Sequence, residues 1–131
     1  MEKFRKSERL CSRKSIGRLF SGGNILFHYP FKMIWLESAG ENPFPARIVI
    51  GVSGKKIKRA VNRNRIKRLI RESYRASKGR LYESLTLRNR HIDIALLYVA
   101  DNVYDYDLID MKLKELFNKF IQNDEPGKEI L

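Results

Sequence analysis

One short stretch of this 131-residue sequence concentrates positive charge. Residues 55–75 read KKIKRAVNRNRIKRLIRESYR, with ten Lys or Arg and one acidic residue, Glu72. That leaves 17 of the 27 basic and 14 of the 15 acidic side chains for the rest of the chain, so most of the net charge of +12 lies here. Such a density of cations binds phosphates, which indicates nucleic acid or an anionic membrane surface as partner. A helix face that is merely solvated is the alternative.

The spacing within the stretch predicts an amphipathic helix over residues 58–77. At about 100° per residue, one side collects mostly apolar residues and should pack on the fold: Asn62, Ile66, Leu69, Ile70, Ser73, Tyr74 and Ala76. The opposite side carries Asn64, Lys67, Arg68, Arg71 and Arg75, with Arg63 and Arg65 near its edges. Like charges meet there at i, i+3 and i+4, which costs about 0.2–0.5 kcal/mol per pair. An anion would relieve this repulsion.

Several shorter elements must position this helix. A first helix is expected after Ser12, with Ile16, Leu19 and Phe20 on one face, ending at the Gly pair of residues 21–24. Residues 25–37, rich in aromatic and branched side chains, are expected to form one bent or interrupted strand around Pro30. Residues 46–53 and 91–100 have the continuous apolar runs of buried strands.

The chain is expected to close with a second amphipathic helix. Its apolar face has helical spacing: Ile109, Leu113, Leu116, Phe117, Phe120 and Ile121. Residues 78–90 are interpreted as a polar connection and residues 123–131 as a flexible tail. The predicted fold is a single-domain α+β two-layer sandwich over residues 1–131, with an ordered core of about 9–122 and the order helix–strand–strand–strand–helix–strand–helix.

Protein-based catalysis and metal binding find little support. His28 and His91 lie apart without a carboxylate or Ser at a recognisable spacing, so neither suggests a nucleophile or a metal site. The acids between Asp101 and Asp110 cross a turn into a helix start, where carboxylates favour the helix dipole. The lone Cys11 fits a reducing compartment. No run reaches the roughly 18–20 apolar residues of a membrane span and no secretory signal is evident, so a cytoplasmic protein is expected.

The basic stretch also resembles a known family. AVNRNRIKRLIRESYR is similar to the signature of the protein subunit of bacterial ribonuclease P, whose core is Arg-Asn-Arg, here Arg63, Asn64 and Arg65. The resemblance extends over about residues 9–122, through RLFSGG, FKMIWL, GVSGKK and HIDIALLYVA in the family's order. Ile16 stands where an aromatic residue is common in the family, and Gly54 where a basic or small polar residue is more usual.

The resemblance implies a function in which the protein does not cleave. A large RNA subunit with bound Mg²⁺ would hydrolyse precursor tRNA to release its 5′ leader, while the protein grips both RNAs, without an obligate protein partner and away from membranes. It implies these contacts to the catalytic RNA: Lys55, Lys56, Arg59, Arg63, Asn64, Arg65, Lys67, Arg68 and Arg71. It implies a leader-binding cleft between the first helix and the sheet, lined by Ile16, Phe20 and Trp35, because aromatic rings stack on any base. It also implies a left-handed strand–helix–strand crossover, against the usual hand.

Two other function classes stay open at this stage. A ribosomal or other structural RNA-binding protein would share the charge and the small α+β form, without needing an aromatic cleft. A membrane-surface protein would expose the apolar side of its basic helix to lipid, whereas this side is needed to cover the sheet.

Overall fold

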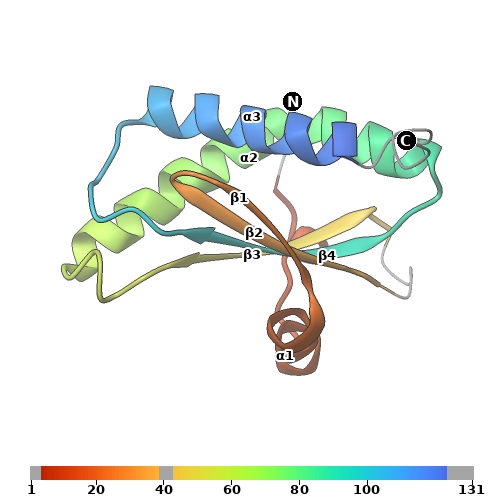
Figure 1. Cartoon of the computed structure of the whole chain (residues 1–131), viewed down its shortest axis with the longest axis horizontal. Helices are drawn as coiled ribbons and strands as arrows, with labels where there is room; N and C mark the ends of the chain where they lie inside the picture. The colour runs from red at the N-terminus through yellow and green to blue at the C-terminus, as the bar shows by residue number, and fades with distance from the viewer. Residues whose placement is uncertain (1–3, 39–42, 124–131) are drawn as a thin grey trace.

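The chain folds around one mixed four-stranded sheet (Figure 1). In the computed structural model, which describes residues 4–38 and 43–123, the strands lie in the order β1-β2-β4-β3. The strands are β1 (Asn24–His28), β2 (Phe31–Glu37), β3 (Ala46–Val52) and β4 (Ile92–Tyr98). The helices are α1 (Arg13–Gly22), α2 (Ala60–Leu87) and α3 (Tyr106–Asn123), preceded by the short 3-10 helix η1 (Lys6–Glu8). The predicted α+β class and element order are confirmed.

The two faces of the sheet carry different helices. The helices α2 and α3 lie together over one face and α1 lies against the other, so we call them the α2–α3 face and the α1 face (Figure 1). Side chains alternate between the faces along each strand. In β2, Met33 belongs to the main core beneath α2 and α3, whereas Ile34 packs with Leu19 of α1. The α1 face therefore has a core of its own, smaller than the main one.

The long helix α2 packs on the sheet through the apolar side that its sequence predicts. Ile66, Ile70 and Tyr74 are fully buried, as is the small polar Ser73. Ala76, predicted on the same side, is exposed, because it lies at the edge of the apolar arc. Burying one side of α2 leaves the other side to the surface along the helix.

The parallel neighbours β3 and β4 are joined through α2. In Figure 1 both strands run from right to left beneath α2, and β4 lies in front of β3. This makes the crossover left-handed, the hand that the family resemblance implies and the reverse of the general rule.

Of the two forms expected around Pro30, a bent continuous strand is wrong and an interruption is found. Residues 24–28 and 31–37 form an antiparallel hairpin, in which Ile25 pairs with Ile34 and Phe27 with Lys32. The turn at Tyr29–Pro30 has a cis peptide bond, and the Pro30 carbonyl accepts a hydrogen bond from Val99 N. The composition predicts strand on both sides of the proline, and pairing of the two halves with each other depends on contacts that composition does not encode.

The polar connection expected over residues 78–90 is mostly helix. α2 continues to Leu87 because Leu81 and Leu85 extend its buried row, which outweighs the cost of about 1 kcal/mol for Gly79 inside a helix. Asn89, with φ of 53°, ends it, and Arg90 N donates back to the Leu85 carbonyl. Asparagine is one of the few residues that adopt this left-handed conformation easily. The predicted tail lies outside the described residues, apart from Asn123, which ends α3.

A buried ion pair ties the N-terminal segment to α2. The Glu8 carboxylate, with no solvent exposure, accepts hydrogen bonds from Lys78 Nζ at 2.5 Å and from the Tyr82 hydroxyl. Burial alone would raise the pKa of Glu8, but these donors outweigh it and hold the pKa below its ordinary value of 4.5. Next to this pair, Leu10 N donates to the Ile48 carbonyl, so the segment follows β3 before crossing to the α1 face.

We expect Glu8→Ala to lower the free energy of unfolding by about 3–5 kcal/mol near neutral pH, because it removes the carboxylate from a buried ion pair. Glu83→Ala, which removes an exposed carboxylate from α2, should change it by less than about 0.5 kcal/mol. Chemical denaturation measures both. Since the pKa of Glu8 is lowered on folding, its contribution is complete above pH 4.5 and is lost as the pH falls below it. Equal losses in the two variants would contradict the assignment.

Candidate nucleic-acid interface

The structure gathers the predicted RNA contacts on one outer surface, formed by α2 and the turn before it. Arg65, Arg68 and Arg71 are exposed and Lys67 is half-buried. Lys55 and Lys56 are exposed on the turn that leads from β3 into the helix. We call this surface the basic face and define it by these residues together with Arg59 and Asn64, both exposed. None of their side chains has a hydrogen bond or ion pair with residues 4–38 or 43–123.

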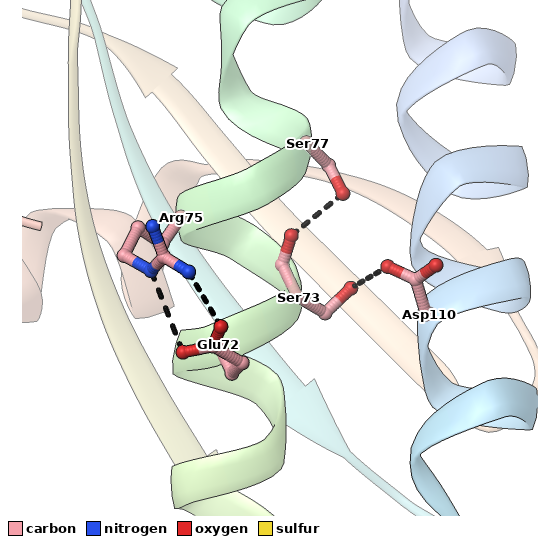
Figure 2. A network of polar contacts seen from close by, with 5 residues as sticks. All are labelled: Glu72, Ser73, Arg75, Ser77 and Asp110. Carbon is pink, nitrogen blue, oxygen red and sulfur yellow. Dashed lines mark hydrogen bonds and ion pairs between the residues drawn. The ribbon is translucent and has the colours of Figure 1, made fainter. Parts of the chain in front are cut away.

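Two residues predicted with this surface have partners inside the protein. Arg75 forms an ion pair with Glu72 one turn earlier (Figure 2), and the hydrogen bonds that it donates lower the pKa of that carboxyl group. Arg63 Nη1 donates to the carbonyls of Ile57 and Lys58, at 2.8 and 2.9 Å. Glu72 lies at i−3 from Arg75 in the sequence, so this pair follows from helical spacing, whereas the sequence does not show that the carbonyls of Ile57 and Lys58 fold within reach of Arg63.

The rotation of α2 is set by polar contacts with α3 as well as by apolar packing. In Figure 2 the Ser73 hydroxyl donates to Asp110 of α3 at 2.7 Å, and Ser77 donates to the Ser73 carbonyl at 2.6 Å. Asp110 also accepts from Lys114 at 2.8 Å. Burial would raise the pKa of Asp110, but the hydrogen bonds from Lys114 and Ser73 lower it. These contacts hold the basic face outward.

The acids near residue 105 serve the fold. Asp105 Oδ1 accepts from Leu108 N in the first turn of α3, as a helix-capping carboxylate does. Within the described part of the chain, no group of three His, Cys, Asp or Glu is arranged to hold a metal ion. The same residues include no helix that is long and apolar enough to cross a membrane.

The predicted leader-binding residues do not come together on one face. Ile16 packs with the small core on the α1 face, and Phe20 is 54% exposed at the end of α1. Trp35 points to the α2–α3 face, where its ring meets Phe120 at a centroid distance of 5.3 Å. The expectation that Phe20 and Trp35 border a common groove is therefore wrong. Trp35 and Ile34 are neighbours in β2, so their side chains point to opposite faces of the sheet, and Ile34 is the one that faces α1.

Another row of side chains crosses the α1 face. Phe27 pairs with Lys32, Lys32 with Leu97, and Leu97 with Gly51, so one residue from each strand stands in register. Phe27 is 53% exposed and Lys32 is half-buried beside it. At the β3 end, a hollow of about 250 Å³ lies between Gly51, Leu97 and Ser53, next to the turn of the basic face. This row is not among the residues predicted from the sequence, although the alternation in residues 31–37 places Lys32 and Trp35 on opposite faces of the sheet.

Comparisons with known proteins agree with this architecture. The family model described as Ribonuclease P matches residues 4–121. The ribonuclease P protein component of Porphyromonas gingivalis is 32% identical over 110 residues, covering 84% of this chain and 80% of that protein. The component of Clostridium acetobutylicum is 41% identical over 103 residues, covering 79% of this chain and 75% of that protein.

Solved structures share the fold. The RNase P protein from Thermotoga maritima superimposes with a TM-score of 0.66 at 24% identity, covering 86% of this chain and 96% of that one. The RNase P protein of Staphylococcus aureus gives 0.65 at 21% identity, covering 88% and 96%. Because the family match spans nearly all of the described residues, the chain belongs to the ribonuclease P protein family.

Proposed function

We propose that this protein grips two RNAs at once during tRNA 5′-end maturation. Its basic face would hold the catalytic RNA, and the α1 face of its sheet would hold the single-stranded 5′ leader of precursor tRNA. The RNA subunit, with its Mg²⁺, would carry out the hydrolysis. The observation that carries this proposal is the continuity of the two surfaces: the turn with Lys55 and Lys56 follows directly on β3, where the row across the α1 face ends.

The basic face suits folded RNA because its cations follow one another along α2 and pair with no carboxylate of the described residues. Arg65 and Arg68 stand one turn apart, as do Arg68 and Arg71, so their repulsion opposes the helix until an anion arrives. The planar guanidinium of arginine binds phosphate through two parallel hydrogen bonds. A phosphate backbone running along α2 would relieve this repulsion, and the relief would add to the free energy of binding.

The row on the α1 face suits a single strand. Phe27 and Phe20 offer exposed rings on which a base can stack, and Lys32 can meet the phosphate between bases. Stacking needs only the flat face of a base, so the groove would accept leaders of many sequences. Ile16 would contribute apolar contact from α1 rather than stacking.

We assign Mg²⁺ to the RNA subunit on chemical grounds. Mg²⁺ prefers hard oxygen ligands and keeps several waters, and RNA phosphates supply such oxygens. This chain, with a net charge of +12, would instead repel a divalent cation over much of its surface. The protein's own contribution would be to position the substrate and to neutralise phosphate repulsion between the two RNAs.

Reconstitution tests the proposal directly. The purified protein is added to a bacterial ribonuclease P RNA at low Mg²⁺, and release of the leader from precursor tRNA is measured. We expect cleavage to be faster than with either component alone, because the protein supplies cationic contacts that high Mg²⁺ otherwise provides. No stimulation, combined with no binding to the RNA, would refute the proposed function.

Arg65→Ala and Arg68→Ala should each weaken binding to the catalytic RNA by about 1–3 kcal/mol, because each removes a charge-assisted contact. Both side chains are exposed, so the melting temperature should stay the same. The slope of log affinity against log salt should become shallower by about 0.7–0.9 per lost phosphate contact. Lys112→Ala on α3, which removes the same charge elsewhere, should have a smaller effect. An affinity that barely responds to salt would contradict the proposal.

If the row that begins at Phe27 on the α1 face binds the leader, substitutions of Phe27 and of Trp35 should affect RNA binding differently. Phe27→Leu should weaken binding of precursor tRNA by about 1–3 kcal/mol and leave binding of mature tRNA unchanged, because the variant lacks a ring that can stack. Phe27→Tyr keeps the ring and should bind precursor tRNA as the wild-type protein does. Trp35→Ala removes packing against Phe120, so it should lower stability and affect both RNAs equally. Fluorescence titration with the two tRNAs measures the difference. A leader-specific loss in Trp35→Ala alone would reverse the assignment.

A further inference from the structure

We propose that Arg63 is the positioning residue of the basic face. Its side chain holds the turn that carries Lys55 and Lys56, so that both lysines meet the RNA only when Arg63 is in place. The inference rests on the proposed RNA-binding function of this face, and it assigns to Arg63 a role different from those of Arg65 and Arg68, which are exposed.

The hydrogen bonds of Arg63 account for this role. A terminal guanidinium nitrogen carries two N–H groups, and Arg63 Nη1 contacts two successive carbonyls, those of Ile57 and Lys58, at 2.8 and 2.9 Å. Both donors of that nitrogen are thus committed to the turn. Arg63 is correspondingly half-buried, although it lies only two residues from the exposed Arg65.

Two other contacts hold the end of the turn. Ile57 is 4% exposed within the main core, and its N–H donates to the Ser53 carbonyl at 2.9 Å. Arg59, the residue that precedes α2, makes no side-chain capping bond. Arg63 is therefore the side chain that connects the turn to the first turns of α2, and Lys55 and Lys56 lie between Ser53 and Ile57.

The rest of the guanidinium stays available. Within the described residues, Arg63 has no hydrogen bond through Nε or Nη2, and these two nitrogens form an edge that can take a phosphate bidentately. The two carbonyls fix the plane of this edge before RNA arrives, which reduces the rotamer entropy lost on binding. Arg63 would thus contribute one direct contact and, through the turn, two indirect ones.

A mutant cycle separates these contributions. Arg63→Met keeps the apolar stem and removes the donors, Arg65→Met removes the same charge without touching the turn, and Lys55→Met/Lys56→Met removes the two lysines. Binding to a bacterial ribonuclease P RNA should fall on the order of tenfold for Arg65→Met, and on the order of a hundredfold or more for Arg63→Met, since three contacts are lost. The salt slope should fall about three times as much in Arg63→Met as in Arg65→Met.

The lysine-free background gives the decisive comparison. There, Arg63→Met should cost only its own contact, about tenfold, whereas Arg65→Met should cost the same as in the wild-type background. Equal, additive losses for Arg63 and Arg65 in both backgrounds would reduce Arg63 to an ordinary phosphate contact and overturn the proposal. Arg63→Gln repeats the cycle if Arg63→Met proves too unstable.

Hydrogen exchange of the protein without RNA is the independent readout. Arg63→Met should speed exchange of the Ile57 amide at least tenfold, and Arg65→Met should leave it unchanged, because the Arg63 side chain bonds the Ile57 and Lys58 carbonyls and the Arg65 side chain makes no such bond within the described residues. Unchanged Ile57 exchange in Arg63→Met would overturn the proposal even if RNA binding fell. Faster exchange together with no RNA binding by the wild-type protein would refute the proposed function and leave the structural role of Arg63 intact.

Discussion

The packing of α2 on the sheet is the interaction on which the rest of the structure depends. Ile66, Ile70 and Tyr74 are buried without exposure, and each belongs to the main core. Because side chains on a helix repeat every 3.6 residues, burying this side leaves the arginines on the other side no place but the surface. Ser73 then fixes the helix against α3 through Asp110. One helix therefore supplies both the core of the protein and its main charged surface.

The basic face lowers the stability of α2, and apolar burial along the same helix offsets this cost. The cations of the basic face repel one another. The ion pair between Glu72 and Arg75 lies beyond Arg71, at the C-terminal end of this face. The fold carries this cost because apolar burial along α2, which reaches Leu81 and Leu85, outweighs repulsions worth tenths of a kcal/mol each. Charge is paired internally where the chain is buried, as for Glu8 with Lys78, whereas the side chains of the basic face pair with no carboxylate of the described residues.

The two faces of the sheet divide the remaining tasks. The α2–α3 face holds the main core, including Trp35, while α1 covers only part of the opposite face. Phe27 and Lys32 consequently stay accessible beside α1, in register with Leu97 and Gly51. α1 therefore leaves one end of this row uncovered, and the turn of the basic face follows directly on β3 at the other end.

The sequence by itself determined the local features: the amphipathic period of α2, the charge at residues 55–75, the order of helices and strands, and the motif around Asn64 that identifies the family. Only the tertiary structure decided that β1 and β2 form a hairpin, that Trp35 faces Phe120, and that Arg63 bonds the carbonyls of Ile57 and Lys58. The reason is physical. Periodicity and charge density are properties of neighbouring residues, whereas the choice of strand partner, sheet face and hydrogen-bond acceptor depends on segments that meet only when the whole core closes.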